Sequence, residues 1–253
     1  MTGNLFGDYI RQRREDAWLT RTDLAKRANL SVSLIEKIEL GARPPTLHAL
    51  QILFDELDVA PMYRRHILEH SLPELYGTPT PSRPPRPDTH DLADLETLIG
   101  PACLYTLPTF TILAANAAHR HAFPGLHPGM SFIEWMFLTP TAREVIVEWH
   151  TEASRLIHSL RMLTPNLTTN PTTAAIIENC SRTPEWNDLW PGRPHPTPGD
   201  ARLALRDLHR RRTRTVQIRL YSPEYPTRHW WLCRLIPNPS PAEPLTESVR
   251  TML

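Results

Sequence analysis

Residues 20–45 carry side chains that can contact a nucleic acid. Ser33 and Lys37 are four residues apart and therefore share one face of a helix, with Val32 beside them. Such a face reaches base edges in the major groove, where Lys37 suits guanine acceptors and Val32 suits a thymine methyl group. Phosphates or the minor groove suit three flanking residues: Arg21, Ser31 and Arg43. Two alternatives stay open, because Val32 could lie in the core and Arg43 could be a solvated loop charge.

Two short helices must position these side chains. The first is predicted over residues 22–28 and the second over residues 32–39, with Ser31 as the cap of the second. Asn29 between them tolerates the left-handed conformation that ends a helix, and Gly41 with two following prolines stops the second helix. The inward residues of the second helix recur at helical spacing: Leu34, Ile35 and Ile38.

This layout resembles the helix-turn-helix of Xre-type, phage-repressor-like DNA-binding proteins. The resemblance spans roughly residues 4–72 and rests on Leu19–Thr20, Asp23–Leu24–Ala25, Leu30–Ser31, Ile35, Ile38–Glu39, Gly41, Arg43 and Pro45. It implies an all-α domain that binds double-stranded operator DNA as a homodimer, with half-sites about 34 Å apart. Three further helices, over residues 4–17, 47–57 and 61–70, complete five. The alternative is a plain helical hairpin in a bundle.

The charge is nearly balanced. The 253 residues include 28 Lys and Arg against 27 Asp and Glu, which gives a net charge of +1. Residues 1–75 hold 10 Lys and Arg against 11 Asp and Glu, a net charge of −1. This balance counts against tight nonspecific binding, which depends on neutralising phosphates. Cations close to the motif, rather than the net charge, would steer the phosphate backbone.

Proline-rich stretches divide the chain. We expect a DNA-binding domain over residues 1–76, a linker over 77–90, a second domain over 91–237 and a tail over 238–253. The linker holds five prolines and should be extended and semi-rigid, although it could instead pack as a surface strap.

The second domain alternates between helical and strand patterns. Helices are expected over residues 91–99, 116–123, 140–163, 171–180 and 184–190. Strands are expected over residues 102–107, 109–114, 201–208, 215–221 and 229–236, with clear alternation in the last two. A five-stranded antiparallel sheet with helices against one face, an α+β fold, fits this order best.

Residues 98–236 resemble the PAS-like ligand-binding domain of MmyB-type transcription regulators, known from actinobacteria. The matching stretches are Pro101–Leu104, Leu113–Ala117, Phe137–Pro140 with Ala142–Arg143, Trp149, Leu160–Arg161, Asn170–Pro171, Arg182–Trp186 and Leu189–Trp190. The chain departs from that family at Val32–Ser33–Leu34, where a paired-tyrosine recognition helix is usual. The family also tends to have a histidine shortly after the Leu-Trp pair, and the nearest one here is His195, in a proline-rich loop. The resemblance implies a small, lipophilic, fatty-acid-like ligand.

Aromatic residues in this domain are candidates for the walls of an apolar ligand pocket: Trp135, Phe137, Trp149, Trp186 and Trp190. Asn116 and Arg161, with His150 as a third choice, are candidate polar anchors, because the guanidinium of Arg161 can hold both oxygens of a carboxylate. The alternative is that the aromatic residues only fill the helical layer over the sheet. We expect no cofactor apart from such a ligand.

Other functional classes find little support in the sequence. The three cysteines lie far apart without metal-ligand spacing, which favours small buried side chains in a reducing cytosol and predicts no metal site. Neither a long apolar run nor a signal peptide is found, so a soluble cytoplasmic protein without membrane contact is expected. Motifs of hydrolases, metalloproteases and phosphate-binding loops are missing, which argues against an enzyme.

Two hypotheses follow from these observations. The first is a one-component transcription regulator, in which the second domain senses a small ligand and controls operator binding. The rival keeps the helix-turn-helix but assigns the second domain only to dimerisation or protein contacts.

Overall fold

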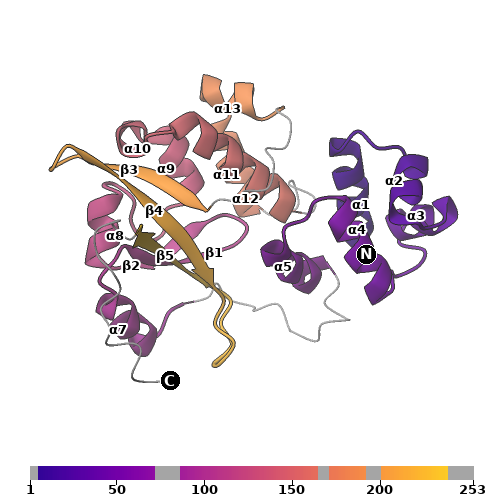
Figure 1. Cartoon of the computed structure of the whole chain (residues 1–253), viewed down its shortest axis with the longest axis horizontal. Helices are drawn as coiled ribbons and strands as arrows, with labels where there is room; N and C mark the ends of the chain where they lie inside the picture. Colours follow the sequence, from indigo (N-terminus) through magenta and orange to yellow (C-terminus); the bar gives the residue numbers. More distant parts are fainter. Residues whose placement is uncertain (1–4, 72–85, 165–170, 192–200, 239–253) are drawn as a thin grey trace.

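The computed structural model of the chain describes residues 5–71, 86–164, 171–191 and 201–238. Most of the expected linker and nearly all of the expected tail lie outside these ranges. Figure 1 shows two groups of elements, with the N-terminal helices on the right and the sheet with its helices on the left. No helix in the described ranges is both long and apolar enough to span a bilayer.

The N-terminal group contains the five expected helices. They are α1 (Leu5–Asp16), α2 (Arg21–Ala28), α3 (Val32–Glu39), α4 (Leu47–Glu56) and α5 (Pro61–Ser71). Their shared core is apolar and fully buried, with Tyr9, Leu24, Ile35 and Leu53 at its centre. Burial of this apolar surface is what holds such short helices in place.

Local side-chain chemistry sets the ends of these helices. Thr20 and Asp23 form a reciprocal capping box at the start of α2. Asn29 ends that helix in the left-handed conformation at φ 50°, and the Thr46 side chain accepts from the amide of Ala49 at the start of α4. The expected cap at Ser31 is confirmed, since its side chain accepts from the amide of Leu34 at the start of α3.

The second group is built on one antiparallel sheet, as predicted. Its strands are β1 (Ala102–Thr106), β2 (Thr111–Ala115), β3 (Arg202–Asp207), β4 (Arg212–Tyr221) and β5 (Trp231–Pro237). Their order across the sheet is β2-β1-β5-β4-β3. The first and the last hairpin meet where β1 pairs with β5, with Cys103 directly opposite Cys233.

Helices lie on both faces of the sheet. The apolar core on one face is shared by α8 (Ala117–Ala122), α9 (Phe132–Leu138), α10 (Pro140–Val145), α11 (Trp149–Leu163), α12 (Pro171–Cys180) and α13 (Pro184–Leu189). The opposite face packs against α7 (Thr89–Thr97), whose Leu95 belongs to one buried cluster with Leu104 and Trp230. The expectation of helices on one face only was therefore wrong for α7. Alternate residues of a strand point to opposite faces, so β1 serves both layers.

A single long helix over residues 140–163 was also a wrong prediction. The chain leaves the helix at Ile146, whose backbone is extended at φ −85° and ψ 111°. Ile146 forms an isolated bridge with Leu205, and the amide of Val147 donates to the carbonyl of Ala204. Apolar residues keep a helical period across this break, so periodicity alone does not reveal it.

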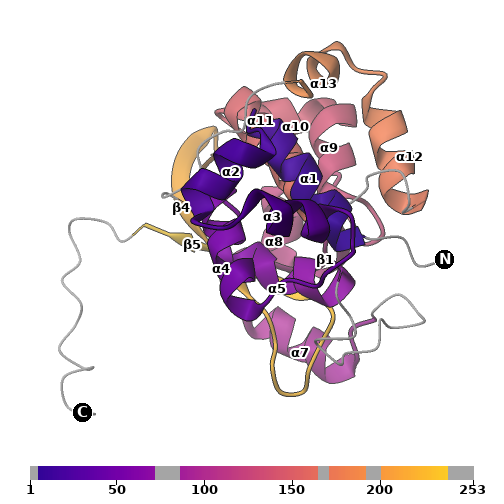
Figure 2. The same ribbon diagram turned by 90° about the vertical axis from the view of Figure 1, so that its right-hand side faces the viewer.

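The two groups touch through α11. This helix contacts α5, and its residue Met162 belongs to the buried core of the N-terminal helices. Figure 2 views the molecule from the side of the N-terminal helices, with α1 and α5 in front of the second group.

Candidate DNA-binding surface and ligand-binding core

The exposed face of α3 holds the residues predicted to read bases. Val32 is 42% exposed, and Ser33 and Lys37 are exposed too, whereas Ile35 and Ile38 are buried. The alternative of Val32 as a core residue is therefore excluded. Glu36 is exposed on the same short helix, and sequence reasoning gave it no part. A carboxylate there can accept from cytosine N4 in the major groove.

Ser31 and Arg43 flank this face at the two ends of α3. The Ser31 hydroxyl caps the helix by accepting from the amide of Leu34 at 3.1 Å. Arg43 is exposed in the loop after α3, where its amide donates to the carbonyl of Lys37 at 3.2 Å. The loop turns at Gly41, which has a φ of 69°. Both residues thus border the face at the positions that the sequence predicted.

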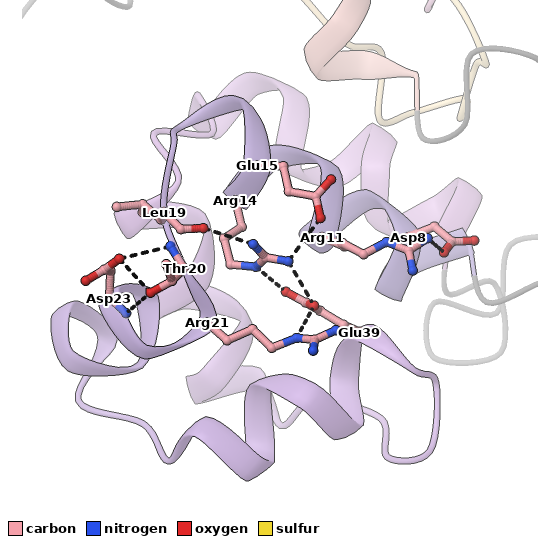
Figure 3. A network of polar contacts seen from close by, with 9 residues as sticks. All are labelled: Asp8, Arg11, Arg14, Glu15, Leu19, Thr20, Arg21, Asp23 and Glu39. Atoms are coloured by element: carbon pink, nitrogen blue, oxygen red, sulfur yellow. Dashed lines mark hydrogen bonds and ion pairs between the residues drawn. The ribbon is translucent and has the colours of Figure 1, made fainter.

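Arg21 has a partner within the fold. Its Nε donates to Glu39 Oε2 at 2.7 Å, and Arg14 of α1 donates to the same carboxylate at 2.6 Å, as Figure 3 shows. Glu39 is only 1% exposed. The two arginines therefore fix the end of α3 to α1 and α2, and the hydrogen bond with Glu39 raises the pKa of Arg14. Arg21 keeps 37% of its side chain exposed.

Four of the predicted aromatic residues form one continuous cluster, here called the aromatic cluster: Phe137, Trp149, Trp186 and Trp190. Ring centroids are 5.4 Å apart for Phe137 and Trp149, 4.9 Å for Phe137 and Trp186, and 5.0 Å for Trp186 and Trp190. The indole of Trp149 donates to the carbonyl of Met136 at 3.0 Å. The cluster joins α9, α11 and α13, and the guanidinium of Arg143 lies over the Trp149 ring at 4.3 Å.

Trp135 belongs to a different group. Its ring lies 5.7 Å from Phe123 and 5.5 Å from Phe132, and its indole donates to the carbonyl of Pro124 at 3.0 Å. The structure therefore divides the five predicted wall residues between two places.

The side-chain amide of Asn116 forms all of its hydrogen bonds within the protein. Its side-chain oxygen accepts from the amides of Ala102 and His119, and its side-chain nitrogen donates to the carbonyls of Leu98 and Gly100. These bonds use two acceptor and two donor positions, which is the full capacity of the amide. A ligand contact predicted at Asn116 would have to break one of them.

The guanidinium of Arg161 lies between two protein groups. It pairs with Asp16 of α1 at 3.0 Å and donates to the carbonyl of Trp190 at 3.1 Å. The third predicted anchor, His150, is exposed.

One buried polar residue was missed by sequence reasoning. His119 is 3% exposed and packs its ring 4.7 Å from that of Phe123, next to the Trp135 group. Among the described residues its Nδ1 has no hydrogen-bond partner. Burial, with a smaller effect of Arg120, lowers the pKa of His119 to about 4, so the ring is neutral at physiological pH. A neutral imidazole in an apolar setting can bond one polar group of a ligand. A single histidine without neighbouring motif residues gives no such signal in the sequence.

A two-helix DNA-reading unit joined to an α+β domain with an aromatic core defines the class of transcription regulators that carry a ligand-binding domain. Residues 5–66 match the model of a helix-turn-helix domain, and residues 93–245 match that of the MmyB-like transcription regulator ligand binding domain. The second match covers more than half of the chain, which therefore belongs to the MmyB-like transcription regulator family. A search of curated proteins finds no match.

Proposed function

We propose that this protein is a one-component regulator that binds operator DNA through α3 and is controlled by a small lipophilic, fatty-acid-like ligand in its second domain. The observation that carries the proposal is the exposed face of Val32, Ser33 and Lys37 on α3. The buried end of this helix, at Glu39, is joined to α1 and α2 by ion pairs. The proposed activity is binding alone, without catalysis.

Two copies are needed for tight binding in this proposal. An eight-residue helix reaches only a few base pairs, and the N-terminal domain offers no net positive charge to add affinity. A homodimer would place two α3 helices in successive major grooves about 34 Å apart. Control by a ligand would then act on the distance or the orientation of the two helices.

The first experiment tests DNA reading. A duplex selected from genomic DNA by the purified protein is titrated against Lys37→Ala and wild type, with fluorescence anisotropy as the readout. We expect the variant to bind about fivefold to about 150-fold more weakly, because one base contact is worth about 1–3 kcal/mol. Lys26→Ala is the matched control, since Lys26 is also exposed but lies on α2. Equal losses for both lysines, or no loss for Lys37, would refute base reading by α3.

The second experiment tests the ligand. Native mass spectrometry of protein purified from its own host should detect a retained lipophilic molecule. The buried Nδ1 of His119, which has no partner among the described residues, supports such a ligand, because sites for molecules of this kind place a few polar groups in apolar surroundings. A stable dimer that retains no molecule would instead favour the rival function, in which the second domain only mediates protein contacts. The near-complete burial of Trp135 and Trp186 is the observation on the side of that rival.

A further inference from the structure

Two arginines and one carboxylate, here called the ionic cluster, join the domains: Arg13 and Asp16 of α1 with Arg161 of α11. Asp16 lies 3.0 Å from Arg161 and 2.7 Å from Arg13, although the second contact lacks hydrogen-bond geometry. The side chains are little exposed, at 3% for Arg13, 17% for Arg161 and 22% for Asp16. Arg161 pairs with Oδ1 and Arg13 with Oδ2, so the two guanidinium groups share one partly buried carboxylate through different oxygens.

The ionic cluster contacts the N-terminal core through Arg13 and the aromatic cluster through Arg161. Arg13 donates to the sulfur of Met162 at 3.1 Å, inside the N-terminal core. Arg161 donates to the carbonyl of Trp190, whose ring stacks on Trp186. A shift of Trp190 would therefore change the acceptor of Arg161 and its hold on Asp16.

Helix α1 continues this path to the recognition helix. Arg14, the residue after Arg13, donates to both oxygens of Glu39 at 2.6 and 3.2 Å (Figure 3). Glu39 is the last residue of α3. The last turn of α1, a helix of 12 residues, thus holds two members of the ionic cluster, Arg13 and Asp16, and also Arg14, which forms the buried ion pair with α3.

We propose that Arg161 is a positioning residue that couples the state of the aromatic cluster to the orientation of α3 through α1. The proposal rests on the proposed function, since it names how the second domain controls DNA binding. Ligand occupancy that moves Trp190 would weaken the pair between Arg161 and Asp16, leave Asp16 to Arg13 of its own helix and thereby tilt α1 against α11. By thermodynamic reciprocity, DNA bound at α3 must in turn change the surroundings of Trp190.

A second contact between the domains provides the control for substitutions of Arg161. Tyr63 of α5 donates to Ser159 of α11 at 3.0 Å, on the same helix as Arg161, and neither residue is a member of the aromatic cluster. If the domains are merely held together, Tyr63→Phe should matter as much as a change of Arg161. If Arg161 carries the coupling, only the change of Arg161 should matter.

The test uses operator DNA as the probe, so that no ligand has to be known. Trp18 is the one tryptophan outside the second domain, and it is replaced by Phe in all proteins, so that tryptophan emission reports only on that domain. Adding the selected duplex should change this emission in the Trp18→Phe background and with Tyr63→Phe. Arg161→Lys keeps the charge but loses the fork that spans two acceptors, and it should reduce the change at least fivefold.

Asp16→Asn is a second variant that breaks the same link from α1, and it should behave like Arg161→Lys. Circular dichroism checks that both are folded. The proposal is overturned if the emission responds to DNA in both variants as in the background, or if the background does not respond although the duplex binds. Failure of the background protein to bind any selected duplex would instead refute the proposed function, and this proposal with it.

Discussion

At the scale of single residues, Glu39 shows how much of the DNA-reading unit depends on one buried charge. Its carboxylate side chain has no exposed surface and faces two arginines, one from α1 and one from α2. Breaking a buried ion pair by removing one partner costs about 3–5 kcal/mol, because the other charge stays buried.

Glu39→Gln should accordingly lower the free energy of unfolding by about 2–4 kcal/mol, with urea denaturation as the measurement. Glu36→Gln on the same helix is the matched control, since Glu36 is exposed and should change stability by less than about 0.5 kcal/mol. Similar small effects of both substitutions would mean that the ion pairs with Glu39 are not stabilising.

His119 makes stability depend on pH. Burial lowers its pKa from 6.5 to about 4, so the unfolded chain binds the proton more readily than the folded protein. Its contribution is therefore complete above about pH 6.5 and is lost as the pH falls towards 4, by about 3 kcal/mol in all. The pKa of His158 is lowered too, mainly through burial. Its contribution to the pH dependence of stability therefore remains in a His119 variant.

His119→Phe keeps a ring against Phe123 and removes the titrating group. We expect the decline in the free energy of unfolding between pH 6.5 and 4.5 to be clearly smaller in this variant than in wild type, as measured by urea denaturation at several pH values. Parallel pH profiles would show that the imidazole is protonated equally in both states of the chain.

At the scale of elements, the connection between α1 and α2 contains a strained residue. Trp18 adopts a left-handed conformation at φ 58° while 86% of its surface is exposed. A residue with a side chain pays about 1–2 kcal/mol for this conformation, and glycine does not.

Trp18→Gly should therefore raise the free energy of unfolding by up to about 1 kcal/mol, since little burial is lost and the extra backbone freedom of glycine in the unfolded chain offsets part of the gain. Thermal unfolding of Trp18→Gly and Trp18→Ala tests this, with the alanine variant expected to show no gain. A loss of stability in the glycine variant would mean that the indole makes contacts that outweigh its strain.

The short helices of the N-terminal domain were predictable from sequence because caps and stop signals act locally. Ser31 and Thr46 each bond an amide three residues ahead, and Asn29 ends α2 by its own backbone preference. The break at Ile146 was not predictable, because it depends on pairing with Leu205, which lies 59 positions later in the chain.

The difference between local signals and contacts between distant segments also separates the two candidate sites. The outward face of α3 follows from helical spacing alone, so Val32, Ser33 and Lys37 lie where the sequence placed them. The partners of Asn116 and Arg161 come from distant segments, namely the start of β1 and the end of α1. Residue type suggested anchors for a ligand, whereas tertiary structure gives both residues protein partners that no local pattern encodes.

At the scale of the whole molecule, the two domains share a core residue. Met162 is 4% exposed and lies among the buried side chains of the N-terminal helices, although it belongs to α11. Replacing a buried methionine by alanine costs about 2–5 kcal/mol, because apolar contacts are lost and a cavity remains.

Met162→Ala should therefore speed hydrogen exchange in α1, measured peptide by peptide with mass spectrometry. Leu160→Ala is the matched control, since Leu160 lies two positions away in the core of the second domain and should affect that domain instead. If Met162→Ala leaves exchange in α1 unchanged, the contact between the domains contributes nothing to the stability of the first.

Met162 also matters for the engineering of hybrid regulators. The helix-turn-helix match ends at residue 66 and the ligand-binding-domain match begins at residue 93. The segment between them is therefore an obvious place at which to exchange sensor domains. A foreign sensor would remove the methionine that fills the N-terminal core and the arginine that faces Asp16. Modular exchange should therefore succeed only when the recipient helix is given a methionine and an arginine at the equivalent positions, because the functional boundary in space runs through α11 rather than through the linker.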